Sequence, residues 1–179
     1  IGVAMRYLAL AFFIVFGMHL ARADDTQGRE AVLNGLSLEN AIAASFIAKG
    51  VEVMTYRAWV KAGQPKDTGP YLLKHAPYTT LYGTRGRTEF LMIQEEGLES
   101  IRLEAKWQQV SGSVDEKLPY LFLNAVYQKP EEHIVIVIDG PGRRVGAIDW
   151  LKNAAKNQDE KIINVFDFEE FLVWSNRNF

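Results

Sequence analysis

One predicted β-hairpin constrains this chain more than any other segment. Residues 88–93 and 100–107 are strand-like runs rich in large apolar side chains, and residues 94–99 between them include Gly97, the type of residue that a tight reversal requires. The two runs therefore predict an antiparallel pair of strands. The register of that pair decides which side chains share a face of the sheet.

The predicted register brings three charged side chains together. If the chain reverses around Glu96 and Gly97, Glu89 lies opposite Glu104. Directly opposed residues project from the same face, with Cβ atoms about 5 Å apart. Lys106 shares that face because side chains alternate along a strand. Two opposed acids repel each other, so they require a compensating cation, either the lysine or a bound metal ion.

Two acids and a lysine on one face predict a metal-dependent hydrolase site. Mg²⁺ binds through one or two carboxylates and keeps its other positions for water and substrate phosphate. Such an ion polarises a phosphoryl oxygen and acidifies water. Lys106 beside it would orient the attacking water or stabilise charge in the transition state. The alternative is that Glu104 and Lys106 form a solvated pair on an exposed strand.

The pattern resembles the PD-(D/E)xK nuclease superfamily. Glu89 on one strand, Glu104-Ala105-Lys106 on the next and Glu39 on a preceding helix follow that family's order of site residues. The resemblance implies a restriction-endonuclease-like α/β fold with an αβββαβ core, in which helices flank a central mixed sheet. It also implies that Glu89 and Glu104 bind Mg²⁺ or Mn²⁺ with the Ala105 carbonyl as a further ligand. Lys106 would then be the catalytic lysine and Glu39 an auxiliary acid.

The resemblance covers residues 37–174 and implies a metal-dependent endodeoxyribonuclease that acts on DNA. The chain departs from the family's usual Pro-Asp at the first acid, where it has Thr88 and Glu89. Two alternatives stay open. The first is a module with the same fold that binds DNA or a protein without cutting, and the second is an exported protein of unrelated function. A homodimer would suit an enzyme that cuts both strands of a duplex.

Further polar residues are candidates for contacts around this site. Gln108 shares the face of Glu104 and Lys106 and would bond a phosphate or a bound water, with a surface amide as the alternative. Basic residues in or near turns are the candidates for contacts to DNA phosphates, with solvated turns and helix starts as the alternative. They are Arg85, Arg87, Lys117 and Arg143.

Glu39 lies in a predicted helix that begins at Ser37 as N-cap and ends at Gly50. Ile42 and Phe46 belong to the apolar stripe of that helix, so Glu39 lies on or beside the buried face. An acid in such a place requires a partner or a ligand. The alternative is that Glu39, near the helix start, complements the helix dipole.

The rest of the chain predicts further elements of one α/β domain. In order, they are a strand at 51–56, a loop over 61–77, a capping box of Ser113 and Glu116, a helix whose regular part begins near Leu118, a buried strand at 133–138, a helix at 145–157, a strand at 161–166 and a closing helical turn at 168–174.

Composition narrows the function. A formal charge of −2 and a pI near 6.0 give no global signature of nucleic-acid binding, so contacts to DNA must come from a local basic patch. The chain has no cysteine, which excludes disulfides and thiolate metal sites. His19, His75 and His133 are too scattered to predict a histidine-based zinc site.

The N-terminal residues 1–23 allow two interpretations, and the nuclease-like domain is expected over 24–179. Met5-Arg6, an apolar run at 7–20 and Ala21-Arg22-Ala23 have the pattern of a secretory signal, and the run is too short for a stable membrane span. The other interpretation is that residues upstream of Met18 are untranslated and that the protein is cytoplasmic. Chemistry on genomic or phage DNA favours the cytoplasm, and this is the location we expect.

Overall fold

The computed structural model describes residues 34–65, 69–94, 99–110 and 115–179, which from Gly35 onwards form one compact unit. The predictions for residues 1–23 and for Ser113 lie outside the described residues, as does most of the hairpin turn. In chain order, the elements are a helix over 34–47, β1 (Glu52–Thr55), α2 (Tyr56–Lys61), β2 (Tyr71–Thr79), β3 (Arg85–Ile93), β4 (Ile101–Trp107), the short 3-10 helix η1 (Asp115–Lys117), α3 (Leu118–Tyr127), β5 (His133–Asp139), α4 (Val145–Lys156), β6 (Ile162–Phe166) and α5 (Phe168–Asn178).

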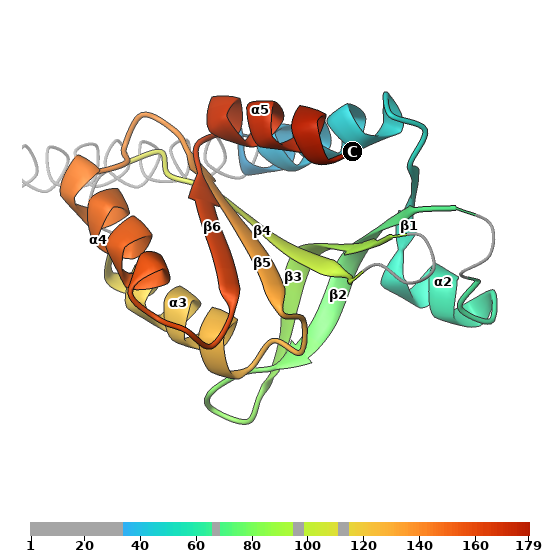
Figure 1. Ribbon diagram of the computed structural model, residues 1–179, viewed down its shortest axis with the longest axis horizontal. Coiled ribbons are helices and arrows are strands. Elements are labelled where there is room, and N and C mark those ends of the chain that lie inside the picture. The colour runs from blue at the N-terminus through green and yellow to red at the C-terminus, as the bar shows by residue number, and fades with distance from the viewer. Residues whose placement is uncertain (1–33, 66–68, 95–98, 111–114) are drawn as a thin grey trace, which may run out of the picture. The chain divides into compact units, whose positions relative to one another are not determined.

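The strands form one mixed sheet of six strands in the order β1-β2-β3-β4-β5-β6. β2, β3 and β4 are antiparallel neighbours, whereas β1 is parallel to β2, and β4, β5 and β6 are parallel to one another. The predicted hairpin is β3 and β4, and the pairs Phe90–Leu103 and Leu91–Arg102 confirm its register. The α/β class, with a central mixed sheet flanked by helices, is confirmed as well (Figure 1).

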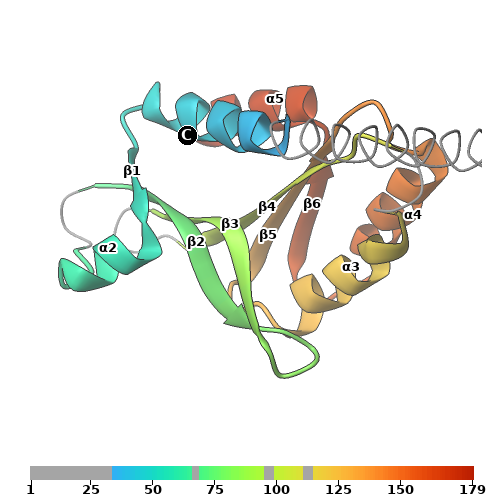
Figure 2. The same cartoon turned by 180° about the vertical axis from the view of Figure 1, so that it is seen from behind.

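One face of the sheet is covered by the helix at 34–47 and by α5, as Figures 1 and 2 show from opposite sides. Ile42 and Phe46 of the first helix and Phe171 of α5 are fully buried there. Alternate residues of β4, among them Leu103 and Ala105, supply the strand side of this cluster. These contacts fix the orientation of β4, because its intervening residues must then project from the opposite face.

The opposite face of the sheet carries two separate hydrophobic clusters. One joins α3 and α4 to β5 and β6, and the other joins Trp59 of α2 to β2 and β3. β4 lies between them, and on this face it presents Arg102, Glu104 and Lys106. Charged side chains therefore line the space between the two clusters.

β2 and β3 continue beyond β4 as a two-stranded ribbon. β3 pairs with β2 along its whole length, but its pairing with β4 ends at Phe90–Leu103. Near the ribbon's tip, the ring of Tyr82 stacks on that of Tyr120 in α3, with centroids 5.0 Å apart. The ribbon and α3 thus flank the place where β3 leaves β4.

The predicted loop over 61–77 is wrong, because it contains most of β2. Tyr71, Leu72 and Leu73 are buried in the sheet, and this apolar run outweighs the turn signals around it. Pro77 stands within the strand although it has no N–H to donate, and its carbonyl accepts a hydrogen bond from Arg102 Nη1 at 3.2 Å.

The predicted helix start at Ser37 is also wrong. The chain is already helical at residue 34, where Gly35 faces the Cβ of Trp107. Glu39 therefore lies beyond the first turn, and the alternative role of complementing the helix dipole fails. The later elements fall close to their predictions, except that the closing helical turn is a full helix, α5.

Candidate active site

The candidate site lies where β3 and β4 separate. Past the pair Phe90–Leu103, the backbone of β3 no longer reaches β4, and the side chain of Glu89 bridges the gap. The backbone N–H of Ala105 donates to Glu89 Oε2 at 3.1 Å. The N–H and carbonyl of one strand residue point to the same neighbouring strand, so the Ala105 carbonyl also faces this gap.

Lys106 holds the two predicted acids together. Its Nζ lies 2.7 Å from Glu89 Oε1 and 2.8 Å from Glu104 Oε2. The side chain of Glu104 is 2% exposed, that of Glu89 18% and that of Lys106 33%. The structure therefore brings Glu89, Glu104 and Lys106 into one group, and solvent reaches it from the side of Lys106.

A second lysine, which the sequence did not single out, completes the group. Lys129 follows α3, is buried and donates a hydrogen bond to Glu104 Oε1. Its Nζ also lies 5.4 Å from the centroid of the Tyr78 ring. A single lysine before Pro130 in a polar connection gives no sequence signal of burial, because its partner is 25 residues away in the chain.

Burial and neighbouring charges shift the pKa values of Glu89 and Glu104 in opposite directions. Burial, together with the charge of Glu104, raises the pKa of Glu89 to about 7. Burial opposes ionisation of Glu104 too, but the ammonium groups of Lys129 and Lys106 outweigh it and hold the pKa of Glu104 at about 2. At neutral pH the group therefore contains one firmly ionised carboxylate and one that titrates.

The neighbouring cations and phenol respond to the same charges. Burial lowers the pKa of Lys129, and the Glu104 carboxylate opposes that shift. For Lys106, burial is outweighed by the two carboxylates, which raise its pKa above the usual value. Burial, and then the charge of Glu104, raises the pKa of Tyr78 to about 12, so this phenol stays protonated and available as a donor.

A buried arginine of β4, Arg102, bonds to the β2–β3 ribbon beside the site. Arg102 is buried and forms a two-point ion pair with Glu131, in which its Nη2 lies 2.7 Å from Oε1. Its Nη1 donates to Thr88 Oγ1 at 3.0 Å and to the carbonyl of Ala76 at 3.3 Å. These bonds connect β4 to β2 and to the residue of β3 that precedes Glu89.

Gln108 lies at the end of β4 and is fully buried. Its Nε2 donates to Asp115 Oδ1 at 2.9 Å, while its Oε1 has no hydrogen-bond partner within the described ranges. The Gly140 to Gly142 turn packs directly on this segment, and a Cβ on Gly140 would lie 2.4 Å from the Gln108 carbonyl oxygen. Glycine is therefore required at both positions by close backbone packing.

The donor set around Lys106 fits a hard divalent cation. Glu89 and Glu104 point toward one position, where the Lys106 ammonium already places a positive charge between their oxygens. Carboxylate and carbonyl oxygens are the ligands that Mg²⁺ and Mn²⁺ prefer. No third Asp, Glu or His joins these two acids in the part of the chain that the structure describes.

The other predicted site residues lie elsewhere. The helix of Glu39 covers the face of the sheet opposite to Glu104, and the structure does not bring Glu39 to the pair. Lys117 is exposed in η1, at the start of α3. Arg85 and Arg87 are exposed on the ribbon, four and two residues before Glu89 on β3.

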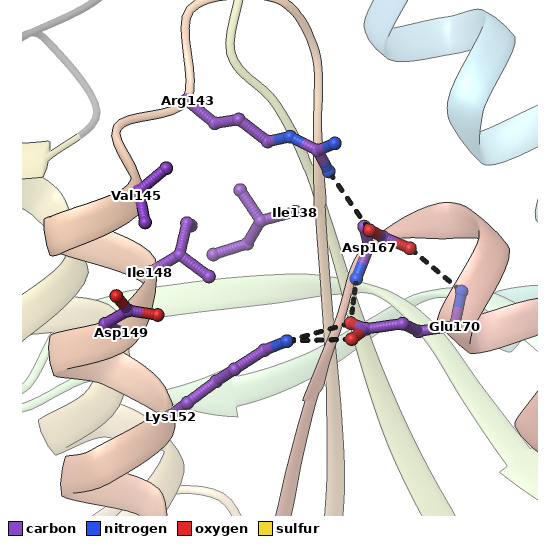
Figure 3. Close-up of a pocket in the computed structure, with 8 residues that line it drawn as sticks. All are labelled: Ile138, Arg143, Val145, Ile148, Asp149, Lys152, Asp167 and Glu170. Atoms are coloured by element: carbon purple, nitrogen blue, oxygen red, sulfur yellow. Dashed lines mark hydrogen bonds and ion pairs between the residues drawn. The ribbon is translucent and has the colours of Figure 1, made fainter.

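Arg143 lies in a pocket of about 220 Å³ between α4 and α5, in which acidic groups compensate its charge (Figure 3). Its Nη1 lies 3.3 Å from Asp139 Oδ1 and 3.5 Å from Asp167 Oδ2. In the same pocket, Lys152 pairs with Glu170 at 2.9 Å. The predicted contact between Arg143 and DNA would have to compete with these pairs.

The fold and the site together define a mixed α/β domain with two glutamates and a lysine converging where neighbouring strands part. A family model described as the PD-(D/E)XK nuclease superfamily domain matches residues 30–179, and the chain belongs to this superfamily. The family predicted from Glu89, Glu104 and Lys106 is thereby confirmed. No curated protein and no solved structure matches the chain significantly. Among the described helices, none combines the length and apolar character that a membrane crossing requires.

Proposed function

We propose that this protein is a metal-dependent endodeoxyribonuclease that hydrolyses phosphodiester bonds at the Glu89, Glu104 and Lys106 group. The observation that carries the proposal is the convergence of the two carboxylates on one ammonium group, at 2.7 and 2.8 Å. Membership of the nuclease superfamily supports the reaction class. The complete set of two acids and a lysine favours a cutting enzyme over a module that only binds.

The residues of the group have separate roles in this proposal. Glu89 and Glu104 would hold Mg²⁺ or Mn²⁺ with the Ala105 carbonyl, which faces the same gap. The ion, when bound, would polarise the phosphoryl group and acidify water. Lys106 would move out from between the carboxylates, orient the attacking water and stabilise the negative charge that develops on the phosphoryl oxygens. Lys129 would keep Glu104 ionised and fix its orientation through Oε1.

The test is a cleavage assay on supercoiled and branched DNA with Mg²⁺, Mn²⁺ or EDTA, comparing wild type with Lys106→Ala. We expect metal-dependent cutting by the wild type and a loss of at least about 10²-fold in the variant, the scale of removing one transition-state donor. The matched control is Lys152→Ala, which removes a surface lysine that also pairs with a glutamate at 2.9 Å. Full activity of Lys106→Ala would overturn the assignment.

A metal-binding readout separates chemistry from binding. Mn²⁺ binding, measured by water-proton relaxation, should survive in Lys106→Ala and weaken strongly in Glu104→Gln. Glu39→Gln should reduce cleavage less than Glu104→Gln does, because the helix of Glu39 lies on the other face of the sheet. A folded wild type that binds DNA but cuts none of the substrates would overturn the proposed hydrolysis and favour a module that only binds DNA.

A further inference from the structure

A groove lined by basic side chains lies between α2 and the ribbon of β2 and β3, and two of its arginines precede Glu89 on β3. It has a volume of about 580 Å³, and the charged residues that line it within the described ranges are all basic. They come from three elements, α2, β2 and β3, and are Arg57, Lys74, Arg85 and Arg87, with His75 among them. Among the residues that the structure describes, no acid lines this groove, although the chain as a whole has a formal charge of −2.

The basic side chains of the groove are unpaired. Within the described ranges, Arg57, Lys74, Arg85 and Arg87 form no ion pair and no side-chain hydrogen bond. Arg143, in contrast, has two acidic partners, Asp139 and Asp167. Cations that line a groove without acidic partners in the protein are free to bind an anionic ligand.

The strand register shows that these cations form a row. Lys74 is opposite Thr55 at the end of β1, while Arg85 is opposite Thr79 at the far end of β2. Lys74 and Thr79 are five residues apart, which corresponds to about 17 Å along a strand. Such a row is too long for a single phosphate ion and suits a polyanion with charges repeated along its length.

The row leads to the candidate active site. His75 stands between the pairs Lys74–Phe90 and Ala76–Thr88, and so lies opposite Glu89. His75 has a φ of 60°, a conformation that non-glycine residues rarely adopt and that clusters at functional sites. Arg87 precedes Glu89 by two residues on the same strand, which corresponds to about 7 Å along it.

We propose that this groove binds the sugar-phosphate backbone of the nucleic-acid strand whose phosphodiester enters the Glu89 and Glu104 site. The inference rests on the proposed function and adds Arg57, Lys74 and His75 to the two arginines expected from the sequence. Lys74 and Arg87 take the phosphates nearest the site, and Arg85 and Arg57 take those farther along the groove. The contacts are to phosphates, so the groove sets position and affinity without reading the base sequence.

The experiment measures binding of a short fluorescein-labelled DNA duplex to the full chain in EDTA over a series of KCl concentrations. The variants are Arg85→Gln with Arg87→Gln, and separately Arg57→Gln with Lys74→Gln. The matched control is Lys156→Gln with Arg177→Gln, which removes the same charge from the last turns of α4 and α5.

Each groove pair should lower the salt dependence, the slope of log K against log[KCl], by roughly 0.9 for each lost phosphate contact. We expect a reduction of about 1.8 per pair and weaker binding at low salt, while the control pair keeps the wild-type slope. Equal slopes in groove and control variants would overturn the proposal. Stronger binding of polyglutamate than of DNA through the same residues would also overturn it and assign the groove to an acidic protein.

This design tests DNA binding by the groove independently of hydrolysis, because no divalent metal is present during the binding measurement. Groove variants that lose salt dependence, together with a wild type that cuts no DNA when Mg²⁺ is added, would overturn the proposed hydrolysis and support the groove. If cleavage is observed, the groove variants should raise KM more than they lower kcat. A fall in kcat with unchanged KM would contradict a role confined to binding.

Discussion

The acid-lysine group and the basic groove differ in how their charges are compensated, although both include residues of β3. In the group, every charge has a partner: Lys106 joins Glu89 to Glu104, and Lys129 pairs with the other oxygen of Glu104. In the groove, no acid from the described part of the chain lies among the lining cations. The group is buried and internally compensated, whereas the groove is open to solvent and uncompensated.

The difference shows what each region requires from a ligand. A buried carboxylate without a cation is strongly unfavourable, so the group must carry its own positive charges when no metal is bound. The groove is exposed, so water and salt compensate its cations until a polyanion replaces them. Substitutions that remove a cation from the group should therefore lower the stability of the fold. Substitutions that remove a cation from the groove should weaken ligand binding.

The largest effect is expected for Lys129→Met. The substitution leaves the Glu104 carboxylate, which is 2% exposed, without one of its two cations, and breaking a buried pair in this way destabilises by about 3–5 kcal/mol. The measurement is urea unfolding at neutral pH. The matched control is Lys152→Met, whose pair with Glu170 is on the surface and should contribute less than about 1 kcal/mol.

Adding Glu104→Gln to Lys129→Met provides the sharper comparison. The double variant buries no unpaired charge at this position, so part of the lost stability should return. If the two substitutions are simply additive, the pair is not coupled, and the description of the group as internally compensated is wrong.

The next effect is a pH dependence of stability that originates from Glu89. Its pKa rises from 4.5 to about 7 on folding, so the folded protein binds more protons than the unfolded chain between these values. Stability should therefore fall as the pH rises from 4.5 to 7, by up to about 3 kcal/mol at 1.36 kcal/mol per pKa unit. Glu104, with a pKa held at about 2, changes protonation only below this window.

The control for this prediction is Glu89→Gln, which should flatten the dependence between pH 4.5 and 7. Mg²⁺ in excess should stabilise the wild type more at the upper end of this window, because it binds the ionised carboxylate. A wild type whose stability rises across the window, with the variant behaving identically, would show that Glu89 is not the titrating group.

The register of the hairpin could be derived from sequence because it depends on local information. A glycine-containing turn and two apolar runs predict that Glu89 opposes Glu104, and the ladder confirms it up to Phe90–Leu103. The departure of β3 from β4 beyond that pair was not predictable in the same way. Arg102 contacts Thr88 and Glu131 at this place, and contacts with Glu131, 29 residues away in the chain, leave no local pattern in the sequence.

Lys129 and the groove show why the rest of the site was missed. Lys129 acquires its role through a contact distant in sequence, and its own neighbourhood indicates only a solvated connection. Lys74 and His75 were assigned to a loop, so their register beside Arg85 and Arg87 could not be derived. For Glu39, the apolar stripe correctly predicted a buried helix face, but periodicity cannot state which face of a sheet a helix will cover.

The smallest effect, and the most direct test of the comparison, concerns two arginines that the sequence treats alike. Arg87→Gln should weaken binding of a DNA duplex in EDTA and lower the salt dependence by about 0.9, as expected for one lost phosphate contact. Arg143→Gln should change it less, because Arg143 is already compensated by Asp139 and Asp167 at 3.3 and 3.5 Å. Both substitutions remove one positive charge, so a difference between them reports local pairing and not net charge. If Arg143→Gln has the larger effect, Arg143 leaves its acidic partners for DNA, and pairing within the structure does not determine which arginines bind phosphate.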